Sequence, residues 1–368
     1  MNHRPTILIT AGTRPEAIKV APLIRLLREQ NWANVRVLAT AQHRELLDQV
    51  FRFFAITPDI DLNIMQPGQS LAELTSRLIP AIDKSLETEK PDIVLAQGDT
   101  TTVMTTALAC FYRRIPFGHI EAGLRTHQRY YPFPEEINRV IVTRLGDLHF
   151  APTPQARENL LRDGVNPEHV SVTGNTVIDA LLWASSQSNL PRGYEPTNGR
   201  KLILVTAHRR ENFGEPLREI CNAISDLVEA RDVEVVYPVH PNPNVIEITD
   251  ELLRDVPGVR LVPPLDYPHF VAAMKAAHLI LTDSGGVQEE APSLGKPVLV
   301  LRDETERPEG VATGTATLVG PHRDRIVAKA LDLLDNPASY ARMSQANNPY
   351  GDGRASERIA EALKNFLN

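Results

Sequence analysis

The chain of 368 residues is 42% hydrophobic and 23% charged, which is typical of a globular protein long enough for two domains. Its net charge of −7 argues against a broad nucleic-acid surface, and no apolar run reaches the roughly 18 to 20 residues that a membrane span needs. We therefore expect neither nucleic acid nor a membrane among its partners.

The two cysteines, Cys110 and Cys221, lie far apart in segments of helical pattern, with no Cys-x-x-Cys pair or His/Cys cluster near either. They predict reduced core thiols in a cytoplasmic protein, and neither a disulfide nor a metal site. The first apolar run is followed at once by Arg14, before the long core of a signal peptide develops, so we expect it to form the first strand.

Short β-branched apolar runs alternate with segments of helical spacing from one end of the chain to the other. This alternation predicts an α/β fold in which helices cover both faces of parallel sheets. Helical spacing is clear over Ala17–Gln30 and Leu71–Glu87. The expected strands are Thr6–Thr13, Val35–Thr40, Asp92–Asp99, Pro116–Ala122, Asp147–Pro152, Leu202–Ala207, Val233–Val239, Val259–Pro263, Leu279–Asp283, Pro297–Leu301 and Ala316–Val319.

A polar segment rich in turn residues, Ser185–Gly199, separates the two halves of this pattern. We expect one Rossmann-like domain over residues 1–184, a second over 200–350, and a last helix within 351–368 that packs back on the first domain. Because ligands of open parallel sheets bind beyond the carboxyl ends of the strands, the expected site is the cleft between the two domains.

Cations and carboxylates follow the strands of the first half. Arg14 and Lys19 lie about one turn apart behind the first strand, where they would bind a phosphate or carboxylate or form an ordinary exposed basic pair. Asp99, Glu121 and Glu135 follow later strands or open the next helix. Crowded carboxylates separate in pKa, so this set predicts an acid/base apparatus.

Each of these carboxylates also has a plainer interpretation. Asp99 is placed to cap the helix that follows it, and Arg125 is a candidate partner for Glu121. The helix dipole alone would explain either Glu135 or Glu136 in a first turn.

The second half places histidines and glycines at its strand ends. His208 is followed by two arginines, a pattern that favours a phosphate, whereas His240 fits a ligand contact or simple loop packing equally well. In Thr282–Glu290, adjacent glycines follow a strand and predict close approach of a ligand to the backbone. The next helix is expected to begin near Val287, which places Glu289 and Glu290 in its first turn and explains Glu289 by helix-terminus stabilisation.

Several of these motifs occur together, over essentially the whole chain: Gly12–Lys19, Gly98–Thr100, His119–Thr126, Pro134–Glu136, Thr173–Asp179, His208–Asn212, Thr282–Glu290, Glu306–Pro308 and Asn348–Gly353. In this combination the chain resembles the bacterial non-hydrolysing UDP-N-acetylglucosamine 2-epimerases, a family with the two-domain architecture of GT-B glycosyltransferases. The resemblance implies interconversion of UDP-GlcNAc and UDP-ManNAc by a homodimer in surface polysaccharide precursor synthesis. No nicotinamide or metal motif is visible, so we expect no cofactor.

The resemblance also implies roles for individual residues. The catalytic acids and base of the family match Asp99, Glu121, Glu135 and His208. Of these, Asp99, Glu121 and His208 would also bind substrate, and the carboxylate of Glu290 would bind the ribose. The remaining expected contacts to the nucleotide are Arg14, Lys19, Phe270, Ser284, Gly285, Gly286 and Arg307. At a further contact position, often Gln in relatives, this chain has Leu265, which leaves only a backbone contact.

The residues suggest a mechanism as well. Carbon C2 of the sugar has no neighbouring carbonyl to acidify its proton, so the feasible route expels UDP from C1 while a carboxylate removes the C2 proton. UDP then adds back to the unsaturated sugar after protonation on the other face, as the family is understood to do. The alternatives are a hydrolysing epimerase, a GT-B glycosyltransferase and a non-catalytic UDP-sugar sensor.

Relatives can carry a second, activating UDP-GlcNAc site. Its expected residues here are Gln42, His43, Glu136, Arg210 and His240. Where some members have Gln and Arg in this region, the chain has Glu45 and Gly68, which argues against activation in that form.

Overall fold

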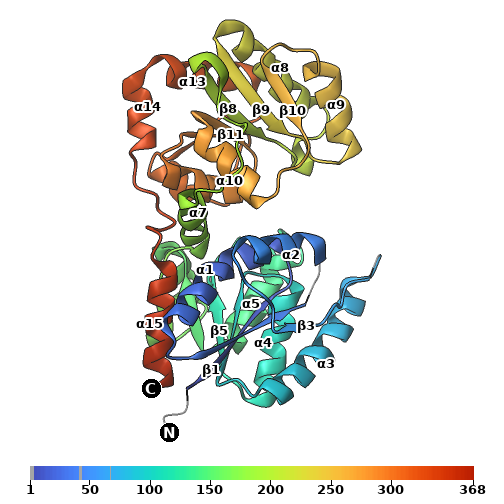
Figure 1. Cartoon of the computed structure of the whole chain (residues 1–368), viewed down its shortest axis with the longest axis vertical. Coiled ribbons are helices and arrows are strands. Elements are labelled where there is room, and N and C mark those ends of the chain that lie inside the picture. Colours follow the sequence, from blue (N-terminus) through green and yellow to red (C-terminus); the bar gives the residue numbers. More distant parts are fainter. Residues whose placement is uncertain (1–3, 41–43, 67) are drawn as a thin grey trace. The chain divides into compact units, whose positions relative to one another are not determined.

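The computed structural model describes residues 4–40, 44–66 and 68–368, which form two units of parallel sheet and helices (Figure 1). Unit 1 comprises the residues up to Ala180 together with Gly351–Asn368, and unit 2 comprises Leu181–Tyr350. The division falls inside helix α7 (Thr176–Ser186), and the polar segment 185–199 begins at the end of this helix. Both units are α/β, as the alternating pattern predicted.

Unit 1 contains a seven-stranded parallel sheet in the order β3-β2-β1-β4-β5-β6-β7. Its strands are β1 (Thr6–Ala11), β2 (Asn34–Ala39), β3 (Ile60–Asp61), β4 (Ile93–Gln97), β5 (Phe117–Ile120), β6 (Leu148–Ala151) and β7 (Val170–Val172). Its helices are α1 (Arg14–Gln30), α2 (Arg44–Phe53), α3 (Leu71–Glu89), α4 (Thr101–Arg113), α5 (Glu135–Leu145), α6 (Pro154–Arg162), the first part of α7, and α15 (Ala355–Leu367). The order reverses between β1 and β4.

Unit 2 contains a six-stranded parallel sheet in the order β10-β9-β8-β11-β12-β13. Its strands are β8 (Lys201–Thr206), β9 (Val233–Pro238), β10 (Val259–Val262), β11 (Leu279–Thr282), β12 (Val298–Val300) and β13 (Ala316–Leu318). Its helices are α8 (Glu215–Ala230), α9 (Pro243–Leu253), α10 (Tyr267–Ala276), α11 (Gly285–Glu290), α12 (Pro308–Ala312), α13 (Arg323–Asp335) and α14 (Pro337–Ser344). This order reverses between β8 and β11.

Local sequence explains where the helices begin and which face they bury. Thr13 and Glu16 form a capping box at the start of α1, in which each side chain bonds the backbone of the other. In α8 the buried positions Leu217, Ile220, Ile224 and Leu227 recur at helical spacing and pack into the core of unit 2. Each buried aliphatic side chain of this kind contributes roughly 1.5–3 kcal/mol.

The last helix, α15, completes unit 1 by packing against α1 (Figure 1). Its buried face is formed by Ala355, Ile359, Ala360 and Leu363. The first turn is capped from a distant part of the chain, because the buried carboxylate of Asp179 accepts hydrogen bonds from the backbone N–H groups of Ala355 and Ser356, at 3.2 and 2.7 Å.

The expected strands are present: β2 and β8 begin and end one residue earlier than expected, the others are shorter, and two further strands were missed. β3 and β7 have two and three residues, which is too short for an alternating or β-branched run to be recognised. Cys110 and Cys221 are both buried inside helices, and burial raises the pKa of each thiol. No helix among the described residues combines the length and apolar character required to traverse a lipid bilayer.

Two buried histidines lie side by side in the sheet of unit 1. His119 on β5 and His149 on β6 are register partners, and each is 1% exposed. Burial lowers the pKa of His119 to about 4 and that of His149 to about 3. Both imidazoles are therefore neutral in the folded unit at pH 7.

We expect the chain to lose stability as the pH falls from 7 to 5, because its unfolded histidines take up protons near pH 6.5 and the folded ones do not. Replacing one of them, His149→Phe, should reduce that loss of unfolding free energy by about 2 kcal/mol. Denaturant unfolding of the two proteins at both pH values measures the difference. Equal losses in the two proteins would contradict the prediction.

Candidate active site

The loops that follow β1, β4, β8 and β11 leave the two sheets where their strand orders reverse. In open parallel sheets, the carboxyl edge beside such a reversal is the usual ligand site, because the following helices diverge to opposite faces there. The loop after β4 carries Asp99 and the loop after β8 carries His208. After β11 come Ser284 and then Gly285 and Gly286, the first residues of α11. In unit 1, Asp99 thus lies where the strand order reverses, and in unit 2 His208 and Ser284 do.

Glu121 follows β5 with its backbone in the left-handed region, at φ 65°. For a residue other than glycine this conformation costs roughly 1–2 kcal/mol. The carboxylate is held by Lys19 Nζ, at 2.7 and 2.8 Å from its two oxygens, by Asn175 Nδ2 at 2.8 Å and by Gln97 Nε2. The ammonium group supplies the positive charge that a buried carboxylate needs. Lys19 is therefore part of the Glu121 site rather than an exposed basic residue.

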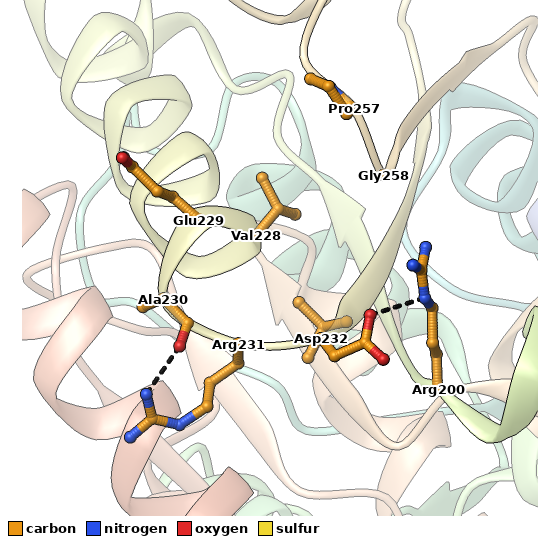
Figure 2. A pocket seen from close by; sticks show the side chains of 9 residues that line it. Arg200, Val228, Glu229, Ala230, Arg231, Asp232, Pro257 and Gly258 are labelled. Carbon is orange, nitrogen blue, oxygen red and sulfur yellow. Dashed lines mark hydrogen bonds and ion pairs between the residues drawn. The ribbon is translucent and has the colours of Figure 1, made fainter.

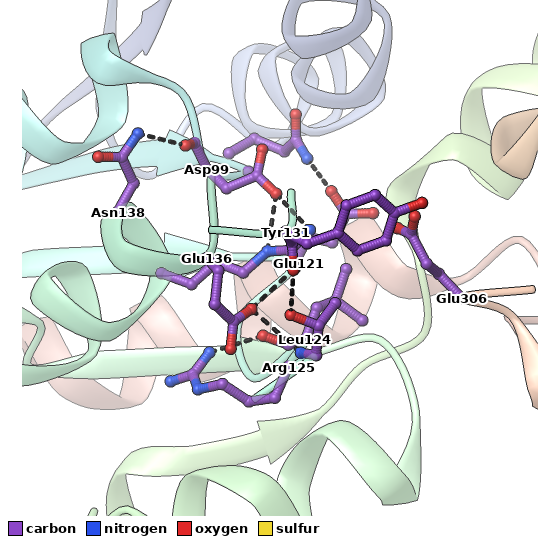
Figure 3. A network of polar contacts seen from close by, with 12 residues as sticks. Asp99, Glu121, Leu124, Arg125, Tyr131, Glu136, Asn138 and Glu306 are labelled. Atoms are coloured by element: carbon purple, nitrogen blue, oxygen red, sulfur yellow. Dashed lines mark hydrogen bonds and ion pairs between the residues drawn. The ribbon is translucent and has the colours of Figure 1, made fainter. Parts of the chain in front are cut away.

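Asp99 has a different set of partners, and Figure 3 shows it beside Asn138. Its carboxylate accepts a hydrogen bond from Nε of Arg139 at 2.8 Å and forms an ion pair with Nη2 at 2.7 Å. Its backbone carbonyl accepts a hydrogen bond from Asn138 Nδ2 at 2.8 Å. Arg139 also contacts Glu136 at 3.2 Å. Because Arg139 and Asn138 lie on α5, the helix that begins at Glu135 is fixed directly to the Asp99 loop.

Glu135 and Arg14 are each the first residue of a helix, α5 and α1 respectively, and both side chains are half-buried. Neither side chain forms a hydrogen bond or ion pair within the described parts of the chain. Both are thus available to a ligand, whereas Asp99, Lys19 and Glu121 already have protein partners.

Two of the plainer interpretations prove wrong. The cap of α4 is Thr100, whose hydroxyl accepts from Val103 N, and not Asp99. Arg125 does not pair with Glu121: it binds Asp163 at 2.8 Å, because its side chain runs back along its own loop.

Glu136 lies in the first turn of α5, where the helix dipole favours a carboxylate, and its buried side chain also bonds outside its own helix. It accepts hydrogen bonds from the backbone N–H groups of Thr126 and His127, at 3.1 and 2.9 Å. Glu136 therefore secures the loop that precedes α5.

In unit 2 a cavity of about 140 Å³ opens beside the β11 loop. Its lining residues are Arg209, Ser284, Gly285, Gly286, Arg302, Thr305, Glu306 and Arg307. Arg302 is paired with Glu211 and Arg307 with Glu289, whereas the guanidinium of Arg209 forms no hydrogen bond or ion pair among the residues placed in the structure. The cavity therefore offers one uncompensated cation together with two held in place by carboxylates.

The two glycines of this cavity are not required by packing. A methyl group on Gly285 or Gly286 would approach no protein atom closer than 3.7 Å, and neither backbone has a positive φ. Their missing side chains instead leave the backbone open to the cavity. This is what a ligand that approaches the main chain requires.

The acidic pair after these glycines differs from the sequence prediction. Helix α11 begins at Gly285 rather than near Val287, so Glu289 and Glu290 lie in its last turn and not its first. Glu289 is buried against Arg307, a role that helix-terminus stabilisation does not describe. Glu290 is also buried, with Oε1 3.7 Å from the position of a Cβ at Gly286.

His208 lies after β8, with 41% of its side chain exposed. Its ring stacks on that of His240, with centroids 5.4 Å apart and planes 9° from parallel. Partial burial lowers the pKa of His208, as do the neighbouring His240 and Arg209, while Asp283 acts in the opposite direction. The structure thus brings the two predicted histidines together.

For the remaining predicted residues, the structure gives a position and an exposure. Phe270 lies half-buried on α10, and Leu265 comes just before Asp266, the residue that caps this helix. Arg210 and His240 are exposed in unit 2, whereas Glu136 is buried in unit 1. Gln42 and His43 lie outside the described residues.

Sequence reasoning missed several residues that complete the two sites. Gln97 directly precedes one motif and Asn175 lies inside another, but neither was assigned a role, and Arg139 was hidden in a helical pattern. In unit 2, Arg209 was predicted only as one of the two arginines after His208, and no role was predicted for Asp283, Arg302, Thr305 or Glu306.

A larger cavity, of about 380 Å³, lies elsewhere in unit 2 (Figure 2). It is bordered by Val228–Val233 and by the ion pair of Arg200 with Asp232, at 2.7 Å. Arg200 and Asp232 directly precede β8 and β9, so this cavity lies at the amino ends of strands, and we do not assign the site to it. No cluster of three or more His, Cys, Asp or Glu side chains suited to a metal ion occurs within the described ranges.

Comparison with known proteins gives consistent matches over the whole chain. Residues 25–364 match the family model described as UDP-N-acetylglucosamine 2-epimerase. The chain is 53% identical over 369 residues to the UDP-N-acetylglucosamine 2-epimerase of Escherichia coli strain K12, covering 98% of both chains.

Solved structures give the same result. The UDP-GlcNAc 2-epimerase of Neisseria meningitidis, solved bound to UDP-GlcNAc, matches with a TM-score of 0.87 and 47% identity, covering 98% of this chain and 100% of that one. The glycotransferase of kitacinnamycin matches with a TM-score of 0.70 at 15% identity, covering 99% of each chain, and shows likeness of fold alone. The fold is therefore GT-B-like, as expected.

Proposed function

The chain belongs to the UDP-N-acetylglucosamine 2-epimerase family and is an isomerase of that kind, and we propose that it interconverts UDP-GlcNAc and UDP-ManNAc by eliminating and re-adding UDP. The observation that carries this mechanism is the placement of carboxylates in unit 1. Asp99 and Glu121 follow the paired strands β4 and β5, and α5, which begins at Glu135, is bonded to the Asp99 loop. We propose catalytic roles for these three carboxylates and for His208.

In the first half of the proposed reaction, the C1–O bond to the diphosphate and the C2–H bond are both broken. The bond from C1 to the diphosphate oxygen breaks as a carboxylate of unit 1 takes the C2 proton, which leaves 2-acetamidoglucal and UDP. A proton then reaches C2 from the opposite face, and the diphosphate oxygen attacks C1 again. Two acid/base groups with different protonation states are needed, which supports a role for more than one carboxylate.

Unit 2 is proposed to hold the UDP. Its basic cavity would bind the diphosphate through Arg209, Arg307 and the backbone of Ser284–Gly286, and Glu290 would bind the ribose hydroxyls. Fixed cations and amides stabilise the charge that develops on the leaving diphosphate. Phe270 and Arg14 are proposed as further nucleotide contacts.

The mechanism predicts exchange of the C2 hydrogen with solvent. In heavy water, turnover of UDP-GlcNAc should place deuterium at C2 of both sugar nucleotides, as NMR would show. Asp99→Asn and Glu121→Gln should each lower kcat by roughly 10²–10⁴, because each removes a proton-transfer group. Asp163→Asn is the matched control, since Asp163 also pairs with an arginine in unit 1.

Other outcomes of that experiment identify the alternatives. Release of free ManNAc and UDP would indicate a hydrolysing epimerase, and a requirement for an acceptor would indicate a glycosyltransferase. Binding of UDP-GlcNAc without turnover would indicate a sensor. Turnover with no deuterium at C2 would exclude the proposed elimination.

The role of the cavity can be tested separately by UDP binding. Arg209→Ala should weaken UDP binding by about tenfold to a hundredfold, because it removes charge-assisted hydrogen bonds worth about 1.5–3 kcal/mol. Calorimetry measures this against Arg254→Ala, which removes an exposed arginine of the same unit outside the cavity. Equal UDP affinity in the two variants would argue against the proposed cavity.

We also propose that the protein is a homodimer. Helices α4 and α5 pack together, and each exposes large apolar side chains. On α5 these are Ile137, Val140 and Ile141, and on α4 they are Phe111 and Tyr112, which are 60% and 64% exposed. A second copy of the chain would cover both helices.

Introducing a charge into this surface should therefore separate the copies. Val140→Asp is expected to give a monomer in light scattering at micromolar concentration, because an unpaired carboxylate would be buried in the interface. Phe366→Asp changes an exposed apolar residue on α15 and should remain a dimer. A monomeric parent protein would contradict the proposal.

The product's use is proposed from the family. UDP-ManNAc would supply precursors of a bacterial surface polysaccharide, and the protein would act in the cytoplasm.

A further inference from the structure

Asp283 is a buried carboxylate that the proposed reaction does not use. It directly follows β11 and is 0% exposed. One oxygen, Oδ2, accepts hydrogen bonds from the backbone N–H groups of His208 and Arg209, both at 2.7 Å, and from Asn212 Nδ2 at 3.1 Å. Asp283 therefore ties the loop after β8 to the end of β11.

The second oxygen, Oδ1, is buried and forms no hydrogen bond within the described parts of the chain. It lies 3.6 Å from Nδ1 of His208. This distance is longer than a hydrogen bond but short enough for an ion pair, and a buried acceptor left without a donor is unfavourable. The geometry thus favours a proton on Nδ1 of His208.

The backbone around His208 is fixed on both sides. Tyr237, which is fully buried on β9, donates from its hydroxyl to the carbonyl of Ala207 at 2.7 Å. The stacked ring of His240 further limits the orientation of the imidazole. The charged and titratable groups that act on the imidazole are Asp283, His240 and Arg209.

We propose that Asp283 is a positioning residue for His208, whose Oδ1 keeps the proton on Nδ1 and leaves Nε2 as the nitrogen that meets the substrate. This inference rests on the proposed role of His208. Neutral imidazole would then accept a proton at Nε2, and imidazolium would donate one from Nε2, with the carboxylate compensating the positive charge. Without Asp283 the tautomer would no longer be fixed.

The tautomer can be observed in the unmodified protein. Long-range ¹H–¹⁵N NMR of histidine-labelled full-length chain, with the His208 signals assigned by their loss in His208→Asn, distinguishes the two nitrogens. We expect neutral His208 to carry its proton on Nδ1. A proton on Nε2 would overturn the proposal, and this measurement does not depend on the folding of any Asp283 variant.

A substitution then tests the cause. In Asp283→Asn the pKa of His208 should fall by about one unit or more, because an opposite charge within 4 Å is lost. Asp179→Asn is the matched control, since Asp179 is another buried carboxylate that accepts two backbone N–H groups. We expect both variants to unfold at a lower temperature than the parent protein. The pKa of His208 should fall only in Asp283→Asn.

The result separates positioning from mere loop support. An unchanged pKa of His208 in folded Asp283→Asn, or an equal change in Asp179→Asn, would overturn the proposal. The proposed function is tested apart from it: normal turnover in His208→Asn would remove the catalytic role of His208, and with it any need for positioning, whatever the tautomer.

Discussion

The uniform direction of the strands is the constraint on which both sites depend. Every pairing between the named strands is parallel, so every strand ends at the same edge of its sheet. Where the strand order reverses, adjacent strands send their helices to opposite faces, and the loops between them remain open. In unit 1 this opening is framed by β1 and β4, and in unit 2 by β8 and β11.

Buried polar groups brace these openings. In unit 1 the fully buried Glu16 accepts hydrogen bonds from Gly12 N, Thr13 N and the hydroxyl of Thr100, so it joins the β1 loop to the β4 loop. Burial raises the pKa of Glu16. In unit 2, Asp283 joins the loops after β8 and β11. Each opening is thus held by a buried carboxylate whose hydrogen bonds connect its two loops.

The strained Glu121 shows how such bracing supports function. Three side chains from three other elements hold its carboxylate, and the next turn needs Gly123, since a Cβ there would lie 2.2 Å from the carbonyl oxygen of Ala156. A left-handed residue persists only where the surroundings fix it. The contacts with Lys19, Gln97 and Asn175 therefore offset the cost of directing this carboxylate away from the strand.

The sequence predicted the alternation of elements and the residues at the strand ends, because both depend on local pattern. Strand order is set by long-range pairing, so the reversal between β1 and β4 had no local signal. The predicted ion-pair partner of Glu121 was wrong for the same reason. Arg125 is near Glu121 in sequence, but Lys19 contacts Glu121 because α1 packs beside the sheet. The prediction that Glu289 lies in a first helical turn was wrong because α11 begins at Gly285. In a helix of six residues, this shift of the first residue places Glu289 in the last turn.

The pairing of arginines in unit 2 has a consequence for the chemistry. Arg302 and Arg307 are each held by a glutamate, which fixes their positions while reducing the net charge of the cavity. A leaving diphosphate gains more from donors that are already oriented than from mobile cations, because no reorganisation is needed as charge develops. Arg209 then supplies the uncompensated charge, and its backbone is fixed by the same Asp283 that faces His208. One buried carboxylate thus positions both a cation for the diphosphate and the adjacent imidazole, so the two functions of this loop cannot be altered independently at Asp283.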